Sequence, residues 1–191
     1  MNKKVKILLL AGDGIGPEVS RSLKTIINCL NTHSNISFDI DEDLIGGASY
    51  DKHRKPITDL VLKKAKSSDS IILGAVGGEI YDNLPFELKP ERGLLKIRKE
   101  LDLFANIRPV KQYPNIPSLF KDIPIDLVVI RENIEDLYAG IEYYHQPGIA
   151  QSIKLISEYG CNSINTFAFE YAKLTGRKSL HCATKANILK T

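Results

Sequence analysis

The first part of the chain alternates short apolar runs with segments of helical periodicity. The apolar runs at residues 6–10 and 70–73 predict buried strands, and the largely alternating pattern at residues 36–44 predicts a third. Apolar side chains at helical spacing predict helices at residues 17–30, 58–65 and 93–101. Because strands that alternate with helices favour βαβ units, we predict an α/β fold with a largely parallel sheet.

The pattern changes near residue 105, where we place a boundary between two domains, residues 1–105 and 106–191. In the second domain the pattern predicts a helix at residues 161–173 and strands at residues 127–131, 137–143, 152–157 and 179–183. Residues 186–190 have the pattern of the opening of a helix. Because a natural domain seldom stops there, we expect the chain to be a fragment or a truncated product.

Two glycine-rich segments follow predicted strands. The segment Gly-Asp-Gly-Ile-Gly-Pro-Glu at residues 12–18 is superficially like a loop that lets a pyrophosphate approach a helix N-terminus. Pro17 lacks a backbone donor, however, and Asp13 and Glu18 add negative charge, so we favour a tight strand-to-helix turn. Residues 74–90 hold three glycines and two prolines, which predicts a long loop with a functional role.

The composition excludes several classes of protein. Apolar residues make up 43% of the chain and charged residues 26%, which is typical of a globular rather than a disordered protein. A net charge of +3 is too small to predict nucleic-acid binding. No apolar run approaches the roughly 20 residues of a membrane span. The widely spaced cysteines predict reduced thiols in a cytoplasmic protein, and they are Cys29, Cys161 and Cys182.

Three arginines are candidate anion ligands. Arg98 lies four residues after Leu94, on the same helical face, Arg108 follows Ala-Asn-Ile, and Arg131 closes an apolar strand. The planar fork of arginine matches a carboxylate in bidentate fashion, so the three side chains could converge on one anion. Salt bridges at the surface explain the same spacing equally well, and the spacing alone does not decide.

Tyr138 and Lys185 are candidates for proton transfer. Tyr138 follows the acidic turn at residues 132–136, where a phenol could donate a proton or simply pack. Lys185 ends a predicted strand and precedes a helical pattern. A lysine there could serve in proton transfer, and a structural role stays open as well.

Six motifs follow one another along the chain. They are Gly-Asp-Gly-Ile-Gly-Pro-Glu at 12–18, Gly-Ala-Val-Gly-Gly at 74–78, Pro-Glu-x-Gly-Leu-Leu-x-x-Arg at 90–98, Ala-Asn-Ile-Arg-Pro at 105–109, Ile-Arg-Glu-Asn at 130–133 and Lys-Ala-Asn at 185–187. Together they resemble the β-decarboxylating dehydrogenases, that is the isopropylmalate, isocitrate, homoisocitrate and tartrate/malate enzymes. The resemblance implies an isopropylmalate dehydrogenase-like α/β fold. Such a fold has a parallel or mixed sheet sandwiched by helices in two subdomains, here with the C-terminal part missing.

The resemblance also implies roles for the candidate residues. Arg98, Arg108 and Arg131 would grip the carboxylates of a branched malate. Tyr138 would protonate the enol that remains after CO₂ leaves. Lys185 would assist removal of the hydroxyl proton, acting across a homodimer into the site of the partner.

The implied cofactors are NAD or NADP and a divalent metal, Mg²⁺ or Mn²⁺. The segment from Gly78 to Glu91 would lie along the nicotinamide cofactor, and Asn187 would contact its nicotinamide half. The aspartates that bind metal in this family follow the Lys-Ala-Asn motif, whereas this chain has no aspartate after Asp136. We therefore expect no metal ligand in these residues and no activity from them alone.

The first part of the chain resembles 3-isopropylmalate dehydrogenase, which makes 2-oxoisocaproate in leucine biosynthesis. Leu94 and Leu95 would form an apolar patch against the isopropyl group. The isocitrate branch has a serine and an asparagine at the positions of Arg92 and Leu94, to hold a third carboxylate. Because a leucine leaves a carboxylate without hydrogen bonds, these residues favour isopropylmalate.

The second part resembles isocitrate dehydrogenase instead, at residues 130–142 and 181–187. Glu135 and Asp136 stand where the isopropylmalate branch usually has a glycine pair. We give more weight to the few residues that would touch substrate and favour isopropylmalate. Isocitrate, and an inactive remnant or regulatory subunit, stay open as alternatives.

Overall fold

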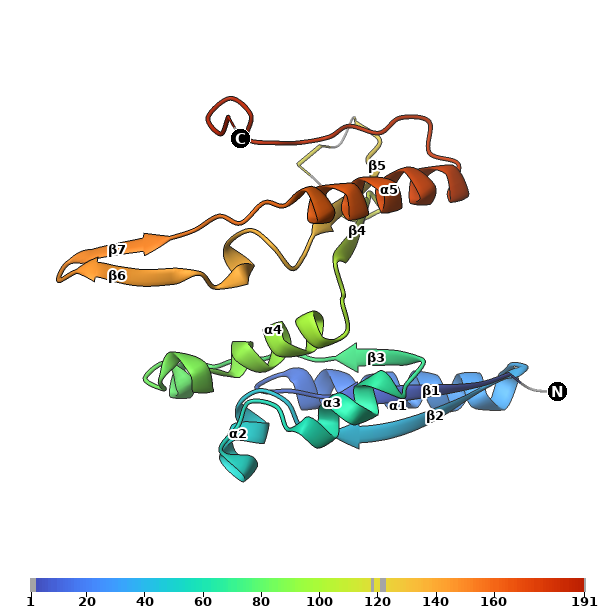
Figure 1. The fold of residues 1–191 in the computed structure, drawn as a ribbon. Coiled ribbons are helices and arrows are strands. Elements are labelled where there is room, and N and C mark those ends of the chain that lie inside the picture. The colour runs from blue at the N-terminus through green and yellow to red at the C-terminus, as the bar shows by residue number, and fades with distance from the viewer. Residues whose placement is uncertain (1–2, 118, 121–122, 191) are drawn as a thin grey trace. The chain divides into compact units, whose positions relative to one another are not determined.

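The computed structural model describes residues 3–117, 119–120 and 123–190 (Figure 1). The chain divides into two compact units, residues 1–102 and 103–191, and each unit is described by itself. No helix of the described residues is both long and apolar enough to cross a bilayer.

The first unit contains a three-stranded parallel sheet in the order β2-β1-β3. Its strands are β1 (Lys3–Leu10), β2 (Ile36–Asp43) and β3 (Ser70–Leu73). Parallel neighbours need long crossover connections. Helix α1 (Gly16–His33) connects β1 to β2, and helices α2 (Gly47–His53) and α3 (Asp59–Lys66) connect β2 to β3. The predicted α/β fold with a parallel sheet is confirmed.

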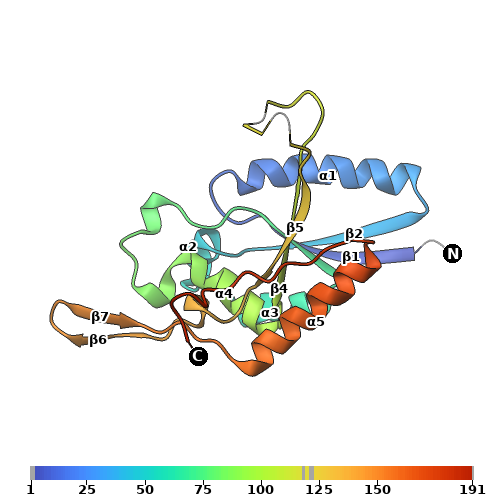
Figure 2. The ribbon, with the colours of Figure 1, turned by 90° about the horizontal axis from the view of Figure 1, so that it is seen from above.

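Helices cover both faces of this sheet (Figure 2). Leu8 and Leu10 of β1 are fully buried in a cluster with side chains of α3 and α4 (Pro90–Glu100). Ile7 and Leu9 are also buried, and because side chains alternate along a strand they point to the opposite face, where α1 lies. Burial on both faces explains why residues 7–10 form an unbroken apolar run.

The sequence pattern located most of this unit but missed helix α2. That helix has seven residues and few apolar side chains, so its periodicity is too weak to detect. The loop at residues 74–90 contains two 3₁₀ turns, Glu79–Tyr81 and Phe86–Leu88. Helix α4 begins at Pro90, three residues before the predicted start, because proline suits a first helical turn.

The second unit contains two antiparallel strand pairs and one long helix. Strand β4 (Ala105–Lys111) pairs with β5 (Asp126–Glu132), and β6 (Glu142–Gln146) pairs with β7 (Ile149–Ser152) in a hairpin. Helix α5 (Glu158–Leu174) follows, and the side chain of Ser157 caps it by accepting from the backbone N–H of Gly160.

Three predicted strands of this unit are wrong. Residues 137–143 begin with a 3₁₀ turn, Leu137–Ala139, and the left-handed Gly140 (φ 66°) ends it before β6 starts. The strand predicted at residues 152–157 ends at Ser152. Residues 179–183 are exposed and form no strand in the described part of the chain, since an apolar pattern makes a strand only beside a hydrogen-bonding neighbour.

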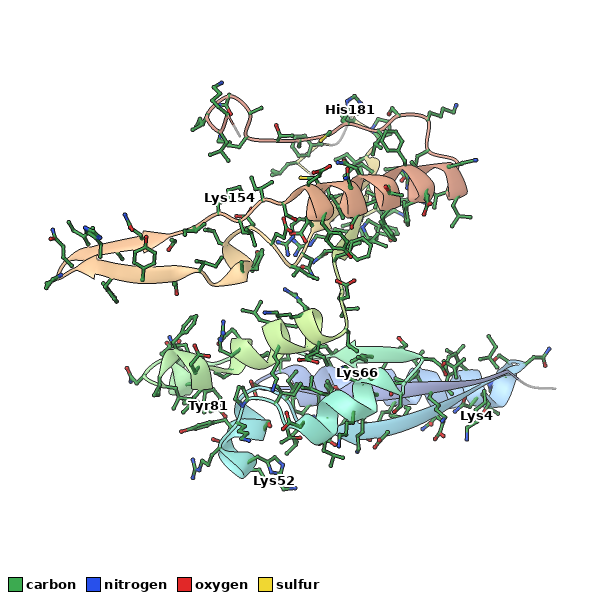
Figure 3. The ribbon with its side chains drawn as sticks, viewed as in Figure 1. Lys4, Lys52, Lys66, Tyr81, Lys154 and His181 are labelled. Atoms are coloured by element: carbon green, nitrogen blue, oxygen red, sulfur yellow. The ribbon has the colours of Figure 1, made fainter. Side chains whose placement is uncertain are left out.

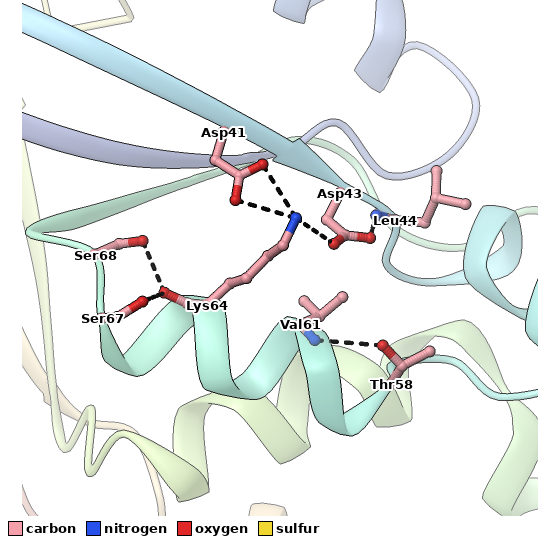
Figure 4. Close-up of polar contacts among 8 residues, drawn as sticks. All are labelled: Asp41, Asp43, Leu44, Thr58, Val61, Lys64, Ser67 and Ser68. Carbon is pink, nitrogen blue, oxygen red and sulfur yellow. Dashed lines mark hydrogen bonds and ion pairs between the residues drawn. The ribbon is translucent and has the colours of Figure 1, made fainter.

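A charge cluster connects α3 to the edge strand β2 (Figure 4). The Lys64 ammonium lies 2.9 Å from a carboxylate oxygen of Asp43 and 3.1 Å from one of Asp41. Burial favours the neutral form of Asp43, but hydrogen bonds from Lys64 and the Leu44 N–H outweigh it and lower the pKa of the Asp43 carboxyl below 3.8. The hydrogen bonds to Asp43 and Asp41 raise the pKa of the Lys64 ammonium above 10.5.

We expect this cluster to make stability depend on pH. The contribution of Asp43 is present above pH 3.8 and is lost as the pH falls through its lowered pKa. The contribution of Lys64 is present below pH 10.5 and is lost as the pH rises through its raised pKa. Urea unfolding should therefore show Lys64→Met destabilised at neutral pH, with the difference from the unmodified chain shrinking below pH 3.8. The exposed neighbour Lys63→Met is the control, and an equal pH dependence in both variants would contradict the assignment.

Candidate active site

The antiparallel ladder of β4 and β5 brings two of the candidate arginines to one face. Asn106 on β4 lies directly opposite Arg131 on β5. Arg108 lies two residues after Asn106, so its side chain leaves the same face of the ladder. The strand register therefore places Arg108 and Arg131 as diagonal neighbours, although 23 positions separate them in the sequence.

A hydrogen-bond network joins these arginines to Tyr138. Arg131 donates from Nη1 to the Tyr138 hydroxyl (3.0 Å) and from Nη2 to Asn133 Oδ1 (2.9 Å). Asn106 donates to the same oxygen (3.2 Å) and accepts from Arg108 Nε (3.1 Å). The structure thus brings together three residues that the sequence singled out separately, with two asparagines between them.

The network carries positive charge that its own members do not neutralise. Its guanidinium groups bond to amides and a phenol, which are neutral acceptors. The Nε of Arg131 is buried and has no hydrogen-bond partner within the described residues. Because a buried donor without an acceptor costs free energy, an anion that reached Arg131 would bind favourably.

The acidic residues beside the network are engaged with other partners. The carboxylate of Glu132 accepts from the N–H groups of Ile134 and Glu135, at 2.9 and 2.8 Å. The carboxylate of Glu135 accepts from the N–H (2.8 Å) and the hydroxyl of Ser157. These bonds give both carboxylates hydrogen-bond donors within the turn that carries Tyr138.

Asp136 fixes the segment before Tyr138 to the chain that leads into α5. It forms an ion pair with Lys154, and its backbone N–H donates to the carbonyl of Leu155 at 2.9 Å. The hydrogen bond from Lys154, labelled in Figure 3, lowers the pKa of the Asp136 carboxyl below its ordinary value. Asp136 has a φ of 62°, a conformation that glycine adopts at less cost. These contacts hold Asp136 in a backbone conformation that is more usual for glycine.

A hollow of about 240 Å³ lies in the first unit, between the loop after β3 and the start of α4. Its walls include Gly78, Glu91 and Leu95, three of the residues that the sequence singled out. Leu94 is different, because it packs against the core of this unit. The structure therefore separates the two leucines that the sequence assigned to one apolar patch.

Two residues that support this hollow were not recognised in the sequence. Gly77 has a φ of 103°, a conformation that favours glycine, and a Cβ atom there would lie 2.5 Å from Glu91 Oε1 at the flexible end of that side chain. The buried carboxylate of Asp13 accepts from the N–H groups of Gly47 (2.8 Å), Ala48 (2.7 Å) and Gly77 (2.9 Å). Asp13 therefore holds three loops together, and its charge is turned inward rather than toward a phosphate at the turn.

Tyr81, which is labelled in Figure 3, also lines the hollow. Its hydroxyl donates to Asp51 at 2.8 Å, and its ring lies against Gly47, where a Cβ would meet it at 2.0 Å. Burial, with the hydrogen bond to Asp51, raises the pKa of Tyr81 to about 12. The phenol therefore stays protonated at neutral pH and acts as a fixed wall.

The other candidate residues lie outside these two groups. Arg98 belongs to the first unit, half-buried on α4. Lys185 and Asn187 are exposed in the segment after α5, where Lys185 accepts two backbone hydrogen bonds in a turn. Within the described residues, no group of three or more His, Cys, Asp or Glu side chains could hold a metal ion.

A family model described as isocitrate/isopropylmalate dehydrogenase matches residues 6–191. The 3-isopropylmalate dehydrogenase of Pelagibacter ubique is 48% identical over 177 residues, which are 90% of this chain and 46% of that protein. The enzyme of the same name from Ruegeria pomeroyi is 39% identical over 97% of this chain and 53% of its own length. The chain thus spans about half the length of these curated relatives.

Solved structures agree with this match. The TT0538 protein from Thermus thermophilus superposes with a TM-score of 0.82 at 34% identity, over 97% of this chain and 36% of its own. Isocitrate dehydrogenase from Methylococcus capsulatus gives the same TM-score at 29% identity, over 97% and 52%. The motifs, the fold and these similarities agree, and the chain belongs to the isocitrate/isopropylmalate dehydrogenase family.

Proposed function

We propose that this chain takes part in the oxidative decarboxylation of 3-isopropylmalate to 2-oxoisocaproate, with reduction of a nicotinamide cofactor, as in leucine biosynthesis. The observation that carries the proposal is the network of Arg108, Arg131 and Tyr138. Two fixed guanidinium groups beside a phenol suit a dicarboxylate that loses one carboxylate and then takes up a proton. The names of the curated relatives support the choice of substrate.

The orientation of Tyr138 supports its role as the proton donor. Its oxygen accepts from Arg131, so its own hydroxyl proton is free to point toward a substrate. Oxidation at C2 would require a hydride acceptor, which a bound nicotinamide would supply, and an acceptor for the hydroxyl proton, the role proposed for Lys185 of a second copy of the chain. The bond from C3 to the departing carboxylate then breaks, its electron pair forms the enol, and Tyr138 delivers a proton to C3. The neighbouring guanidinium stabilises the phenolate that remains.

Isocitrate is the second candidate substrate. Lys89 and Arg92 also line the hollow of the first unit, and the Arg92 guanidinium lies 4.6 Å from the centre of the Phe86 ring. Cationic side chains there could hold the third carboxylate of isocitrate. Against this, Leu95 offers the same hollow an apolar wall, which suits an isopropyl group.

We expect Leu95→Asn to raise the KM for 3-isopropylmalate on the order of 10-fold or more, because the isopropyl group would lose its apolar contact. Steady-state kinetics with 3-isopropylmalate and isocitrate measures the change in preference. Leu60→Asn is the control, since Leu60 is 61% exposed on α3. Leu94→Asn should lower the midpoint of thermal unfolding as well, because Leu94 packs against the core. An unchanged KM in Leu95→Asn would show that Leu95 does not contact the substrate.

The cofactor part of the proposal is NAD or NADP with Mg²⁺ or Mn²⁺. A hollow of about 240 Å³ fits a nicotinamide ring or an isopropyl group rather than a whole dinucleotide. Gly78 and Glu91 would contact the nicotinamide side there, and Asn187 remains a proposed contact. The described residues do not form a metal site, so no step is assigned to a metal here.

A second copy of the chain is also part of the proposal. Lys185 and Asn187 are exposed and so are available to the site of a partner subunit. The hairpin of β6 and β7 is exposed along its whole length and carries Tyr143 and Tyr144, which suits an interface. Residues 1–105 would then form the cofactor side, and residues 106–191 the dimerisation side together with the arginine network. Sedimentation equilibrium tests this, and a monomer at every concentration would refute it.

The proposed function is tested by binding and turnover. Calorimetry with 3-isopropylmalate, isocitrate and the monocarboxylate 2-oxoisocaproate measures recognition without the cofactor. Turnover, which we do not expect from these residues alone, is followed on the full reading frame as reduction of NAD or NADP with each acid and Mg²⁺ or Mn²⁺. We expect 3-isopropylmalate to bind most tightly. Preference for isocitrate would overturn the choice of substrate, and failure of both 3-isopropylmalate and isocitrate to bind would overturn the site.

A further inference from the structure

One buried side chain, Asn133, lies between the two arginines of the candidate active site. Asn133 is 5% exposed, although it directly follows the end of β5. Its Oδ1 accepts from Arg131 Nη2 (2.9 Å) and from Asn106 Nδ2 (3.2 Å). Its own Nδ2 donates to the carbonyl of Leu103 (3.1 Å). The amide therefore has partners for both its oxygen and its nitrogen.

These contacts fix the orientation of a second amide. Because the nitrogen of Asn106 donates to Asn133, the oxygen of Asn106 faces Arg108, whose Nε donates to it at 3.1 Å. Asn133 thus contacts Arg131 directly and reaches Arg108 through one intermediate. The bond to Leu103 ties both arginines to the backbone that leads into β4.

Asparagine suits this position better than similar side chains. An aspartate would accept from Arg131 and Asn106, but its negative charge would neutralise Arg131 and its oxygen would repel the Leu103 carbonyl. An apolar side chain would leave the buried donors of Arg131 and Asn106 without an acceptor. A neutral amide holds the guanidinium in place and leaves its charge available to an anion.

We infer that Asn133 is the positioning residue that aligns Arg131, and through Asn106 also Arg108, for binding of a dicarboxylate. The inference rests on the proposed function for the identity of the anion. It goes beyond that function by assigning the alignment of both arginines to one buried amide. Tyr138 depends on the same alignment, because its hydroxyl accepts from the other amino group of Arg131.

The test compares Asn133→Asp and Asn133→Ala with the control Asn165→Ala, an exposed position on α5. The first readout is the ¹H–¹⁵N spectrum of the arginine side chains, which reports the environment of the Arg131 Nε–H without substrate or cofactor. We expect that signal to shift, and to exchange faster with water in Asn133→Ala, while Asn165→Ala leaves it unchanged. Asn106→Ala should leave the Arg131 signal in place and move that of Arg108.

The second readout is the affinity for 3-isopropylmalate, measured by calorimetry and as KM. We expect Asn133→Ala to weaken binding about 10-fold or more, because a misaligned binding group loses most of its effect. Asn133→Asp should weaken binding further, because it keeps an acceptor for Arg131 and Asn106 but neutralises the charge of Arg131. Asn106→Ala, which removes the acceptor of Arg108 but leaves the bond between Asn133 and Arg131, should weaken binding less.

The outcomes separate this inference from the proposed function. Unchanged Arg131 signals in both Asn133 variants would overturn the positioning role, whatever the substrate. If the Arg131 signals shift but the affinity for 3-isopropylmalate is unchanged, Asn133 has only a structural role and the positioning role is overturned. If the unmodified protein binds neither 3-isopropylmalate nor isocitrate, the proposed function fails, and the arginine spectra still decide whether Asn133 positions Arg131 and Arg108.

Discussion

Arg131→Lys is expected to lower kcat/KM for 3-isopropylmalate on the order of 10³-fold. Arg131 bonds at once to Tyr138 and Asn133, and its buried Nε has no partner within the described residues. A lysine keeps the charge but is a single point donor on a flexible stem, so it cannot align the phenol and hold a carboxylate together. Loss of one partner in a buried charged contact typically costs about 2–5 kcal/mol, which spans this loss of rate. Steady-state kinetics and calorimetry measure the effect.

Arg177→Lys is the matched control for this prediction. Arg177 lies in the same unit and donates to Asp126 at 2.6 Å in an exposed ion pair. Exposed pairs contribute little, so we expect kcat/KM to change less than about twofold. If Arg131→Lys stayed as active as Arg177→Lys, the arginine network would not be the substrate site.

Gly12→Ala is expected to lower the free energy of unfolding by about 3 kcal/mol or more. Gly12 has a φ of 74°, which costs an L-residue about 1–2 kcal/mol. In addition, its new Cβ would lie 1.9 Å from the carbonyl oxygen of Ala75, and a backbone atom cannot move aside cheaply. Urea unfolding followed by circular dichroism measures the loss.

Gly14→Ala separates the cost of the positive φ from the cost of the steric contact expected in Gly12→Ala. Gly14 has a φ of 54°, but nothing lies within 4 Å of a Cβ there. It should therefore cost only the conformational part, about 1–2 kcal/mol. Equal losses in the two variants would mean that the contact between this turn and the loop after β3 is not what requires Gly12.

This steric requirement explains the glycine motif at residues 12–18. A Cβ at Gly16 would lie 2.0 Å from the carbonyl oxygen of Ala11, and one at Gly74 would meet the same oxygen at 2.0 Å. The glycines thus allow the turn after β1 to pack on the loop after β3. The sequence predicted a tight turn, but the partner of that turn lies more than 50 residues away, where local spacing gives no signal.

Part of the candidate site could also be predicted from the sequence, and part could not. The motifs named Arg108, Arg131 and Tyr138, and the position of Asn106 two residues before Arg108 was the available signal that both share a strand face. Asn133 carried no signal beyond its place in the Ile-Arg-Glu-Asn motif. Spacing could not decide between an anion site and surface salt bridges, because that depends on which residue of β5 lies opposite which residue of β4.

The amino-acid pattern by itself determined the α/β class, the parallel strands of the first unit and the types of residue available for chemistry. Buried strands and amphipathic helices are local consequences of side-chain periodicity, so they can be recognised one segment at a time. The tertiary structure alone decided that residues 179–183 form no strand in its described part, that Leu94 packs in the core while Leu95 lines a hollow, and that one amide aligns two arginines. Each of these depends on neighbours that are distant in sequence, and a side chain acquires its role from what it touches.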